Sequence, residues 1–191
     1  MKVEDIKKAA SVGGGVIGSS WTLLFAMKGI EVCQYDINDE QIENCKKNIE
    51  RNIAALVEFG AIKEEDIEKI HERISYTTKI SEAVDGVQFI QENGPERLNL
   101  KQSILAEIEA YAPCEAIYAS SSSGLLISDI TAQAKYPNRC VGGHPYNPPH
   151  LIPLVEITYG EHTDMENVEL AKAFYQSIGK EAVILLSLIH I

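Results

Sequence analysis

The chain has 191 residues, of which 45% are hydrophobic and 24% are charged, and its formal net charge at pH 7 is −11. This length is sufficient for one sizeable domain with a hydrophobic core, and the composition is ordinary for a globular protein. The acidic balance, with no basic cluster, argues against nucleic acid and anionic membrane surfaces as partners.

Segments that target or anchor a protein are not expected in this sequence. No apolar run reaches the roughly 20 residues that cross a bilayer, and the first ten residues have no apolar core of a secretion signal. The four cysteines are scattered and form no CxxC pair. We therefore expect a reduced, cytoplasmic location and no metal site.

Short apolar runs alternate with helical patterns along the chain. The patterns predict strands at 9–12, 30–35, 86–91, 116–119, 139–143 and 154–158, and helices at 16–28, 39–59, 62–73, 95–111, 127–134 and 165–178. Asn38 has the position of a helix N-cap, and Gly29 and Gly60 have the positions of helix stops. This alternation predicts a doubly wound, mainly parallel α/β sheet with a helical hairpin at 39–73, inserted after the second strand.

A glycine pattern lies between the first predicted strand and helix. Gly13, Gly15 and Gly18 form the sequence G-x-G-x-x-G. In a dinucleotide-binding loop the first glycine permits a tight turn, the second lets the backbone approach a pyrophosphate, and the third lets the helix pack on the sheet. The helix N-terminus then offers N–H groups to phosphates. Taken alone, the pattern is equally compatible with a plain glycine-rich turn.

Asp36 ends the second predicted strand, 36 − 13 = 23 residues after the first glycine. A carboxylate about 20 residues after that glycine typically binds the ribose hydroxyls of the dinucleotide. It would repel a 2′-phosphate, so the pair of features predicts NAD rather than NADP. A helix cap is the alternative role for Asp36. Methyltransferases also place a glycine loop and a strand-end acid in this order, so a Rossmann-like methyltransferase is an alternative class.

His144 and Glu156 form the second candidate site. His144 follows a predicted strand and precedes the proline-rich bend at 147–149, and histidine suits a general base at neutral pH. Glu156 lies 156 − 144 = 12 residues later, across the bend, where a carboxylate can hold the imidazole in one tautomer. The alternatives are a surface-loop histidine and a solvated strand-end glutamate.

Two longer motifs give a family resemblance. ASSSSGL (119–125) and GHPYNPPHLIPLVE (143–156), with Ser123 lying 144 − 123 = 21 residues before His144, resemble the NAD-binding domain of the L-3-hydroxyacyl-CoA dehydrogenase family. The resemblance extends over residues 9–185. It implies an NAD-dependent oxidoreductase that acts on the 3-hydroxyl group of a small molecule, a 3-hydroxyacyl-CoA or a related 3-hydroxy acid.

The resemblance also implies roles for individual residues. His144 would take the hydroxyl proton as hydride leaves for NAD, and Glu156 would orient the imidazole. Ser123 would hydrogen-bond the substrate oxygen, and Asn147 would be a further active-site residue. The implied cofactor-binding residues are Gly13, Gly15, Gly18, Asp36, Glu96 and Lys101.

Two departures from the acyl-CoA members of the family leave the substrate open. The run from Ser120 to Gly124 reads SSSSG where those members commonly read SNTSS, and Pro145 replaces a phenylalanine. Both are more similar to the branch that contains lambda-crystallin, L-gulonate 3-dehydrogenase and carnitine dehydrogenase. L-gulonate or carnitine is therefore an alternative substrate, and a non-catalytic dinucleotide-binding or structural protein is a further alternative.

The resemblance implies that a helical domain follows this region. In members of the family that domain closes the substrate cleft and forms the interface of a homodimer. The chain ends in LLSLIHI, and residues 186–191 match the translation of a transposon adapter used in sequencing libraries. We expect residues 1–185 to be the NAD-binding domain and 186–191 to be a non-native tail. A native end of the last strand is the alternative. The chain is expected to bind NAD without appreciable turnover and to expose an apolar face.

Overall fold

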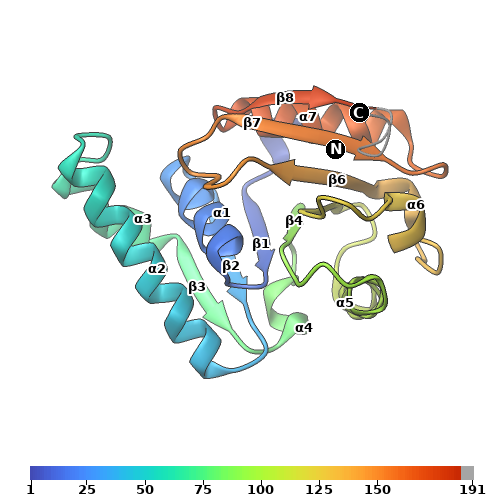
Figure 1. Ribbon diagram of the computed structural model, residues 1–191, viewed down its shortest axis with the longest axis horizontal. Helices are drawn as coiled ribbons and strands as arrows, with labels where there is room; N and C mark the ends of the chain where they lie inside the picture. Colours follow the sequence, from blue (N-terminus) through green and yellow to red (C-terminus); the bar gives the residue numbers. More distant parts are fainter. Residues whose placement is uncertain (186–191) are drawn as a thin grey trace.

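The computed structural model describes residues 1–185, which form an α/β sandwich around one sheet (Figure 1). The sheet has the strand order β3-β2-β1-β4-β5-β6-β7-β8. The β6–β7 pair is antiparallel and the other neighbouring pairs are parallel. The strands are β1 Lys8–Val12, β2 Glu31–Tyr35, β3 Ile74–Thr77, β4 Phe89–Glu92, β5 Ile117–Ser120, β6 Cys140–Pro145, β7 Leu154–Tyr159 and β8 Glu181–Ile184.

Helices cover both faces of this sheet. Their bounds are α1 Val16–Met27, α2 Asp39–Glu58, α3 Ile67–Glu72, α4 Ile80–Ala83, α5 Leu98–Tyr111, α6 Ile127–Ile130 and α7 Met165–Ser177, with 3-10 turns at Val3–Asp5, Glu64–Asp66 and Pro137–Arg139. The hydrophobic core on one face joins α1, α2, α3 and α7 to the sheet, and the core on the other face joins α4, α5 and α6. The predicted doubly wound, mainly parallel fold is confirmed.

An aromatic cluster fixes α1 and α7 against the same face of the sheet. The rings of Phe25 in α1, Phe89 in β4 and Phe174 in α7 all contact one another, and the Phe89 and Phe174 ring centroids are 4.3 Å apart. Trp21 and Tyr175 extend the cluster, and all five rings are buried. Such large buried rings each contribute substantially to stability. Their packing therefore holds α1, the helix that begins at the glycine loop, against the sheet.

Most of the predicted elements are confirmed, including the N-cap at Asn38, whose side chain accepts the Gln41 N–H at 2.9 Å. The helix predicted at 62–73 is wrong in its first half. Ile62 is buried and its N–H donates to the Leu56 carbonyl, which holds it in the turn after α2. A 3-10 turn follows, and α3 begins only at Ile67. The second arm of the predicted hairpin is therefore short.

The sequence patterns miss strands β3 and β8. Both are edge strands, each with a single neighbour, and their residues are mostly half-buried or exposed. Neither strand therefore has the apolar run by which the central strands were recognised.

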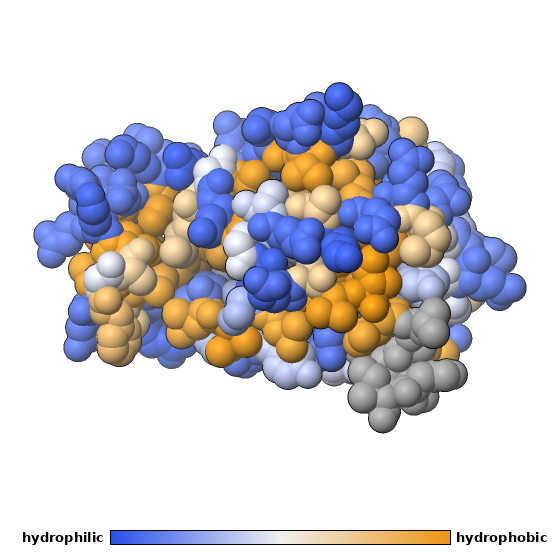
Figure 2. All heavy atoms as spheres, turned by 90° about the horizontal axis from the view of Figure 1, so that it is seen from above, coloured by the Kyte–Doolittle hydropathy of each residue, from blue (hydrophilic) through white to orange (hydrophobic). Residues whose placement is uncertain are grey.

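The face over β7, β8 and α7 carries exposed apolar side chains. Figure 2 views the molecule from this side and shows hydrophobic atoms gathered among hydrophilic ones. These elements and the β6–β7 loop contribute the large exposed hydrophobic residues Tyr146, Leu151, Ile152, Met165 and Val183. No helix in residues 1–185 has both the length and the apolar composition to span a membrane. The predicted non-native tail, 186–191, lies outside the described residues.

Candidate active site

The glycine loop joins β1 to α1 in a conformation that side chains would obstruct. Gly13 has φ +97°, a left-handed value that favours glycine. A Cβ on Gly18 would lie 1.7 Å from the Gly13 carbonyl oxygen, whereas a Cβ on Gly15 would meet nothing within 4 Å. Gly13 and Gly18 are therefore required by the fold of the loop itself. Gly15 leaves open space at the N-terminus of α1.

Asp36, at the end of β2, faces the glycine loop. Its Oδ2 accepts the Gly14 N–H at 2.7 Å, and its Oδ1 accepts the Ile37 N–H at 2.7 Å. Asn38, and not Asp36, caps α2, so the capping alternative does not hold. Asp36, Tyr35, Ile80 and Ile104 line a cavity of about 600 Å³ together with the glycine loop. A dinucleotide half with a ribose and a flat base fits the chemistry of these walls.

His144 and Glu156 lie directly opposite each other in the antiparallel register of β6 and β7. The His144 Nδ1 atom is 2.9 Å from Oε2 of Glu156, and the side chains are 23% and 14% exposed. Antiparallel pairing and the shared face of the sheet make this contact, which the bend between the strands permits. A His–carboxylate pair that is mostly screened from water, yet open on one side, has the arrangement of a general base and its orienting acid.

Tyr146 is a neighbour of this pair that the sequence analysis did not select. Its hydroxyl donates to Oε1 of Glu156 at 3.4 Å, and its ring centroid is 5.9 Å from that of His144. The two residues are separated by one position in the chain, so they lie on the same side of the extended segment. That spacing was the only available sequence signal for Tyr146.

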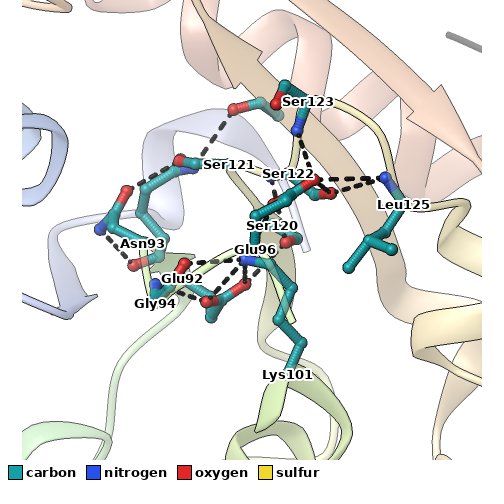
Figure 3. A network of polar contacts seen from close by, with 12 residues as sticks. Glu92, Asn93, Gly94, Glu96, Lys101, Ser120, Ser121, Ser122, Ser123 and Leu125 are labelled. Atoms are coloured by element: carbon teal, nitrogen blue, oxygen red, sulfur yellow. Dashed lines mark hydrogen bonds and ion pairs between the residues drawn. The ribbon is translucent and has the colours of Figure 1, made fainter. Parts of the chain in front are cut away.

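Glu96 holds the serine loop that follows β5 (Figure 3). Its Oε1 accepts the Ser122 hydroxyl and the N–H groups of Ser123, Gly124 and Leu125 at 2.5 to 3.3 Å. Burial acts to raise the pKa of Glu96, but the hydrogen bonds from Ser122, Gly124 and Leu125, together with the Lys101 charge, leave its pKa lowered. Ser123 itself is exposed at the end of this loop.

Lys101 lies inside the protein, where it forms an ion pair with Glu92 (Figure 3). Its Nζ is 3.0 and 2.9 Å from the two oxygens of Glu92, and these side chains are 1% and 0% exposed. The Lys101 ammonium also donates to the Gly94 carbonyl at 3.1 Å. The Gly94 N–H and the hydroxyls of Ser120 and Tyr118 also donate to Glu92, at 2.6, 2.6 and 3.2 Å. Glu92 was not predicted as a site residue; it directly follows the strand predicted at 86–91 and is the last residue of β4 in the structure.

A second buried polar chain connects the glycine loop to the strand of His144. Asn93 donates to the Ser11 hydroxyl of β1 and accepts from Ser121, which in turn accepts from the Gln91 amide. The same amide reaches the Gly143 carbonyl at 3.3 Å, and Gln91 also accepts from the buried Tyr175 hydroxyl. Fully paired polar groups of this kind fix the geometry of a core.

The fold gathers most of the candidate residues at the carboxyl edge of the sheet. The strands β2, β1, β4, β5 and β6 are neighbours in this order in the sheet. Each carries one candidate residue at or after its carboxyl end: Asp36, Gly13, Glu96, Ser123 and His144, respectively. Asn147 is exposed in the loop after β6, beyond His144. The Lys101 ammonium is enclosed, and it lies 3.8 Å from Oε2 of Glu96. Open α/β sheets bind ligands at this edge, so fold and site define a dinucleotide-binding domain of dehydrogenase type.

Comparisons with known proteins identify the family. The NAD-binding domain of 3-hydroxyacyl-CoA dehydrogenases matches residues 8–187. The chain belongs to this family, its cofactor is NAD, and the methyltransferase alternative is overturned.

Two curated relatives and one solved structure illustrate the similarity. The L-carnitine dehydrogenase of Mesorhizobium japonicum is 42% identical over 94% of this chain and 49% of its own length. A 3-hydroxyacyl-CoA dehydrogenase of Gibberella moniliformis is 38% identical over 95% of this chain and 55% of its own length. The crystal structure of Escherichia coli 3-hydroxybutyryl-CoA dehydrogenase superposes with a TM-score of 0.89 at 28% identity, covering 94% of this chain and 38% of the other. The chain spans about half the length of the curated relatives it matches.

Proposed function

We propose that this protein takes part in the NAD-dependent oxidation of the 3-hydroxyl group of a small hydroxy acid or its CoA ester. The observation that supports this most directly is the 2.9 Å contact between His144 Nδ1 and Glu156 Oε2. The pair lies at the sheet edge that also carries the glycine loop. A base and a cofactor site at one edge are what hydride-transferring enzymes need.

In this proposal, His144 is the general base. A neutral imidazole that donates its Nδ1–H to Glu156 keeps a lone pair on Nε2, which can accept the hydroxyl proton. The Glu156 carboxylate then stabilises the imidazolium that forms. Bound NAD supplies the hydride acceptor. Ser123, exposed after the neighbouring strand, would donate to the substrate oxygen, and Asn147 would contact the substrate from the loop after β6.

We assign cofactor binding to the glycine loop and Asp36. The N–H groups at the start of α1 would bind the pyrophosphate, and Asp36 would bind the ribose hydroxyls of the adenosine half. Oε1 of Glu96 is occupied by the serine loop, and its Oε2 lies 3.8 Å from the Lys101 ammonium, so the second ribose would be bound through Oε2 beside that charge. Lys101 is enclosed, so we propose that it acts on the cofactor site indirectly, through Glu92 and the Gly94 carbonyl.

For the substrate, we propose L-carnitine first and a 3-hydroxyacyl-CoA second. Relatives at 36 to 42% identity, from Mesorhizobium japonicum and two Streptomyces species, are L-carnitine dehydrogenases. The 3-hydroxyacyl-CoA dehydrogenase of Gibberella moniliformis, at 38% identity, supports the second candidate. L-gulonate stays as a third candidate, on the resemblance of the serine loop.

Two further properties are proposed, the location of the protein and its oligomeric state. The four cysteines are free thiols, and three of them are buried, which favours a reducing, cytoplasmic location. The family resemblance favours a homodimer for a longer form of the protein. Light scattering on that longer form would measure its oligomeric state directly.

The first test is a fluorescence titration of the 191-residue chain with NADH and with NADPH. We expect NADH to bind at least about 10-fold more tightly, a difference of about 1.4 kcal/mol, because Asp36 repels a 2′-phosphate. Equal or tighter binding of NADPH would contradict the role of Asp36. Asp36→Ala is the matched variant, and it should lose the discrimination while keeping its fold.

The second test is oxidation of NADH in the presence of dehydrocarnitine, acetoacetyl-CoA or dehydrogulonate. Because the curated relatives are about twice as long, it should be run on this chain and on a longer form. We expect turnover by this chain far below the ~10 s⁻¹ typical of enzymes. A longer form with no turnover on any of the three compounds, despite NADH binding, would favour a non-catalytic dinucleotide-binding protein.

A further inference from the structure

Lys180 is a buried lysine that the proposed mechanism does not use. It lies between Gly179 and the first residue of β8, and only 5% of it is exposed to solvent. Removing a charged ammonium from water is costly unless other groups replace the lost hydration. The contacts of Lys180 therefore indicate why a lysine stands at this position.

The groups that the Lys180 ammonium contacts are neutral. His150 of the β6–β7 loop is also near, because burial and then the Lys180 charge lower the pKa of its imidazole. Its Nζ donates to the backbone carbonyls of Pro149 and Ile152, the second at 2.7 Å. On another side it lies 5.1 Å from the ring centroid of Trp21, which belongs to α1. Carbonyl oxygens and an aromatic face both attract a cation. Burial nevertheless lowers the pKa of Lys180 to about 8.

The two carbonyls belong to the loop that connects β6 to β7. Pro148, Pro149 and Pro153 lie in this loop and have no N–H group, so the loop has few internal donors. The N–H groups of Leu151 and Ile152 both donate to the Pro148 carbonyl at 3.0 Å. No loop N–H serves the Pro149 and Ile152 carbonyls in these turn contacts. Lys180 supplies the donors that the prolines remove.

The same loop connects the two residues of the proposed catalytic pair. It begins just after His144 and ends just before Glu156, and it carries Asn147. Trp21, under the lysine, lies on the helix that begins at the glycine loop. Lys180 thus contacts the loop of the catalytic pair and the helix of the cofactor site at once.

We propose that Lys180 is a positioning residue, which fixes the 147–152 loop against α1 and so holds His144 and Glu156 in register. This inference rests on the proposed function only for the importance of the pair. The contacts of Lys180 with the β6–β7 loop and with Trp21 are a property of the fold and do not depend on that function. Neither the glycine loop nor Asp36 contacts Lys180, so cofactor binding should not depend on it.

The test compares Lys180→Met, which keeps the length of the side chain and removes the charge, with Lys180→Arg, which keeps charge and donors. Amide hydrogen exchange of Leu151 and Ile152 is measured by NMR, together with the signal of the hydrogen-bonded Nδ1 proton of His144. We expect exchange at least about 10-fold faster and a lost or shifted proton signal in Lys180→Met. Lys180→Arg should restore both to near the wild-type values.

Lys135→Met is the matched control, since Lys135 also lies over an aromatic ring, that of Tyr136, but on the surface. Its loop exchange should equal that of the wild type. If Lys180→Met does not fold, Lys180→Gln is measured in its place. Unchanged exchange and an unchanged His144 signal in a folded variant without the charge would overturn the proposal that Lys180 positions the loop. NADH titration of the same samples keeps this result separate from the cofactor proposal, because that proposal is judged on the binding of NADH and NADPH by the wild type.

Discussion

The α-carbon of Gly18 faces the carbonyl oxygen of Gly13 so closely that a Cβ at Gly18 would lie 1.7 Å from it. The contact joins the first turn of α1 to the end of β1, and it is possible only because Gly18 has no side chain. Gly15, between them, has open space around the corresponding position. Gly18 is thus needed for the loop to fold. For Gly15 we propose a different role, which is to leave room for the pyrophosphate of NAD.

Substitution by alanine should separate these two roles. Gly18→Ala forces the loop to shift and should lower the free energy of unfolding by about 1–3 kcal/mol or more. Gly15→Ala should change it by no more than about 1 kcal/mol but weaken NADH binding at least about 10-fold, because its methyl group occupies the approach of the pyrophosphate. Urea unfolding and NADH titration measure the two effects. Equal effects of both variants on both quantities would contradict the division.

His144→Ala should remove catalysis and spare the cofactor. In a form of the protein that turns over substrate, we expect the rate to fall by the ~10²–10⁴ typical of a lost general base. NADH affinity should change little, since His144 lies on β6, away from the glycine loop. Steady-state kinetics and NADH titration check the two halves of this prediction. A rate equal to that of the wild type would remove His144 from the mechanism.

Lys101→Met should be strongly destabilising, because it leaves the Glu92 carboxylate buried without its opposite charge. The expected loss in free energy of unfolding is about 3–5 kcal/mol. Lys46→Met is the control, since the Lys46–Glu43 pair is also close, at 2.6 Å, but half-exposed, and it should cost about 0–1 kcal/mol. The double variant Glu92→Gln with Lys101→Met should recover part of the loss. Similar losses for Lys101→Met and Lys46→Met would rule out a stabilising role for the buried pair.

The hydrogen bonds to Glu96 should make stability depend on pH. Its pKa in the folded protein lies below the reference value of 4.5. The folded state therefore favours the carboxylate, so this stabilisation is present above pH 4.5 and is lost as the pH falls through the folded pKa. Glu96→Gln has no such titration. The difference in melting temperature between wild type and Glu96→Gln should shrink as the pH is lowered from 7 to 3. A constant difference would show that the Glu96 carboxylate does not stabilise the folded state.

Local rules allowed the sequence to predict the central part of the fold. Buried strands such as β1 and β5 are short apolar runs, and α2 begins at a capping asparagine, so each is recognisable from its own residues. The edge strands β3 and β8 are not, because only one neighbour pairs with them and their side chains are half in water. Ile62 was misassigned to a helix because it is buried in the turn after α2, where its N–H donates to the Leu56 carbonyl. Its burial therefore comes from packing and not from a position in a helix.

The glycine loop, Asp36 and the candidate pair of His144 and Glu156 were recognisable from the amino-acid sequence. The first two follow from fixed spacing around one turn, and the pair lies on two strands joined by a single bend. Other contacts depend on how the chain folds and could not be read from the sequence: Lys101 pairs with Glu92, Glu96 binds the serine loop, and Lys180 binds the proline-rich loop. The partners in the last two cases are about 30 residues apart. Hydrogen bonds and ion pairs are stronger where the fold removes them from water, and no local pattern records which distant groups the fold will bring together.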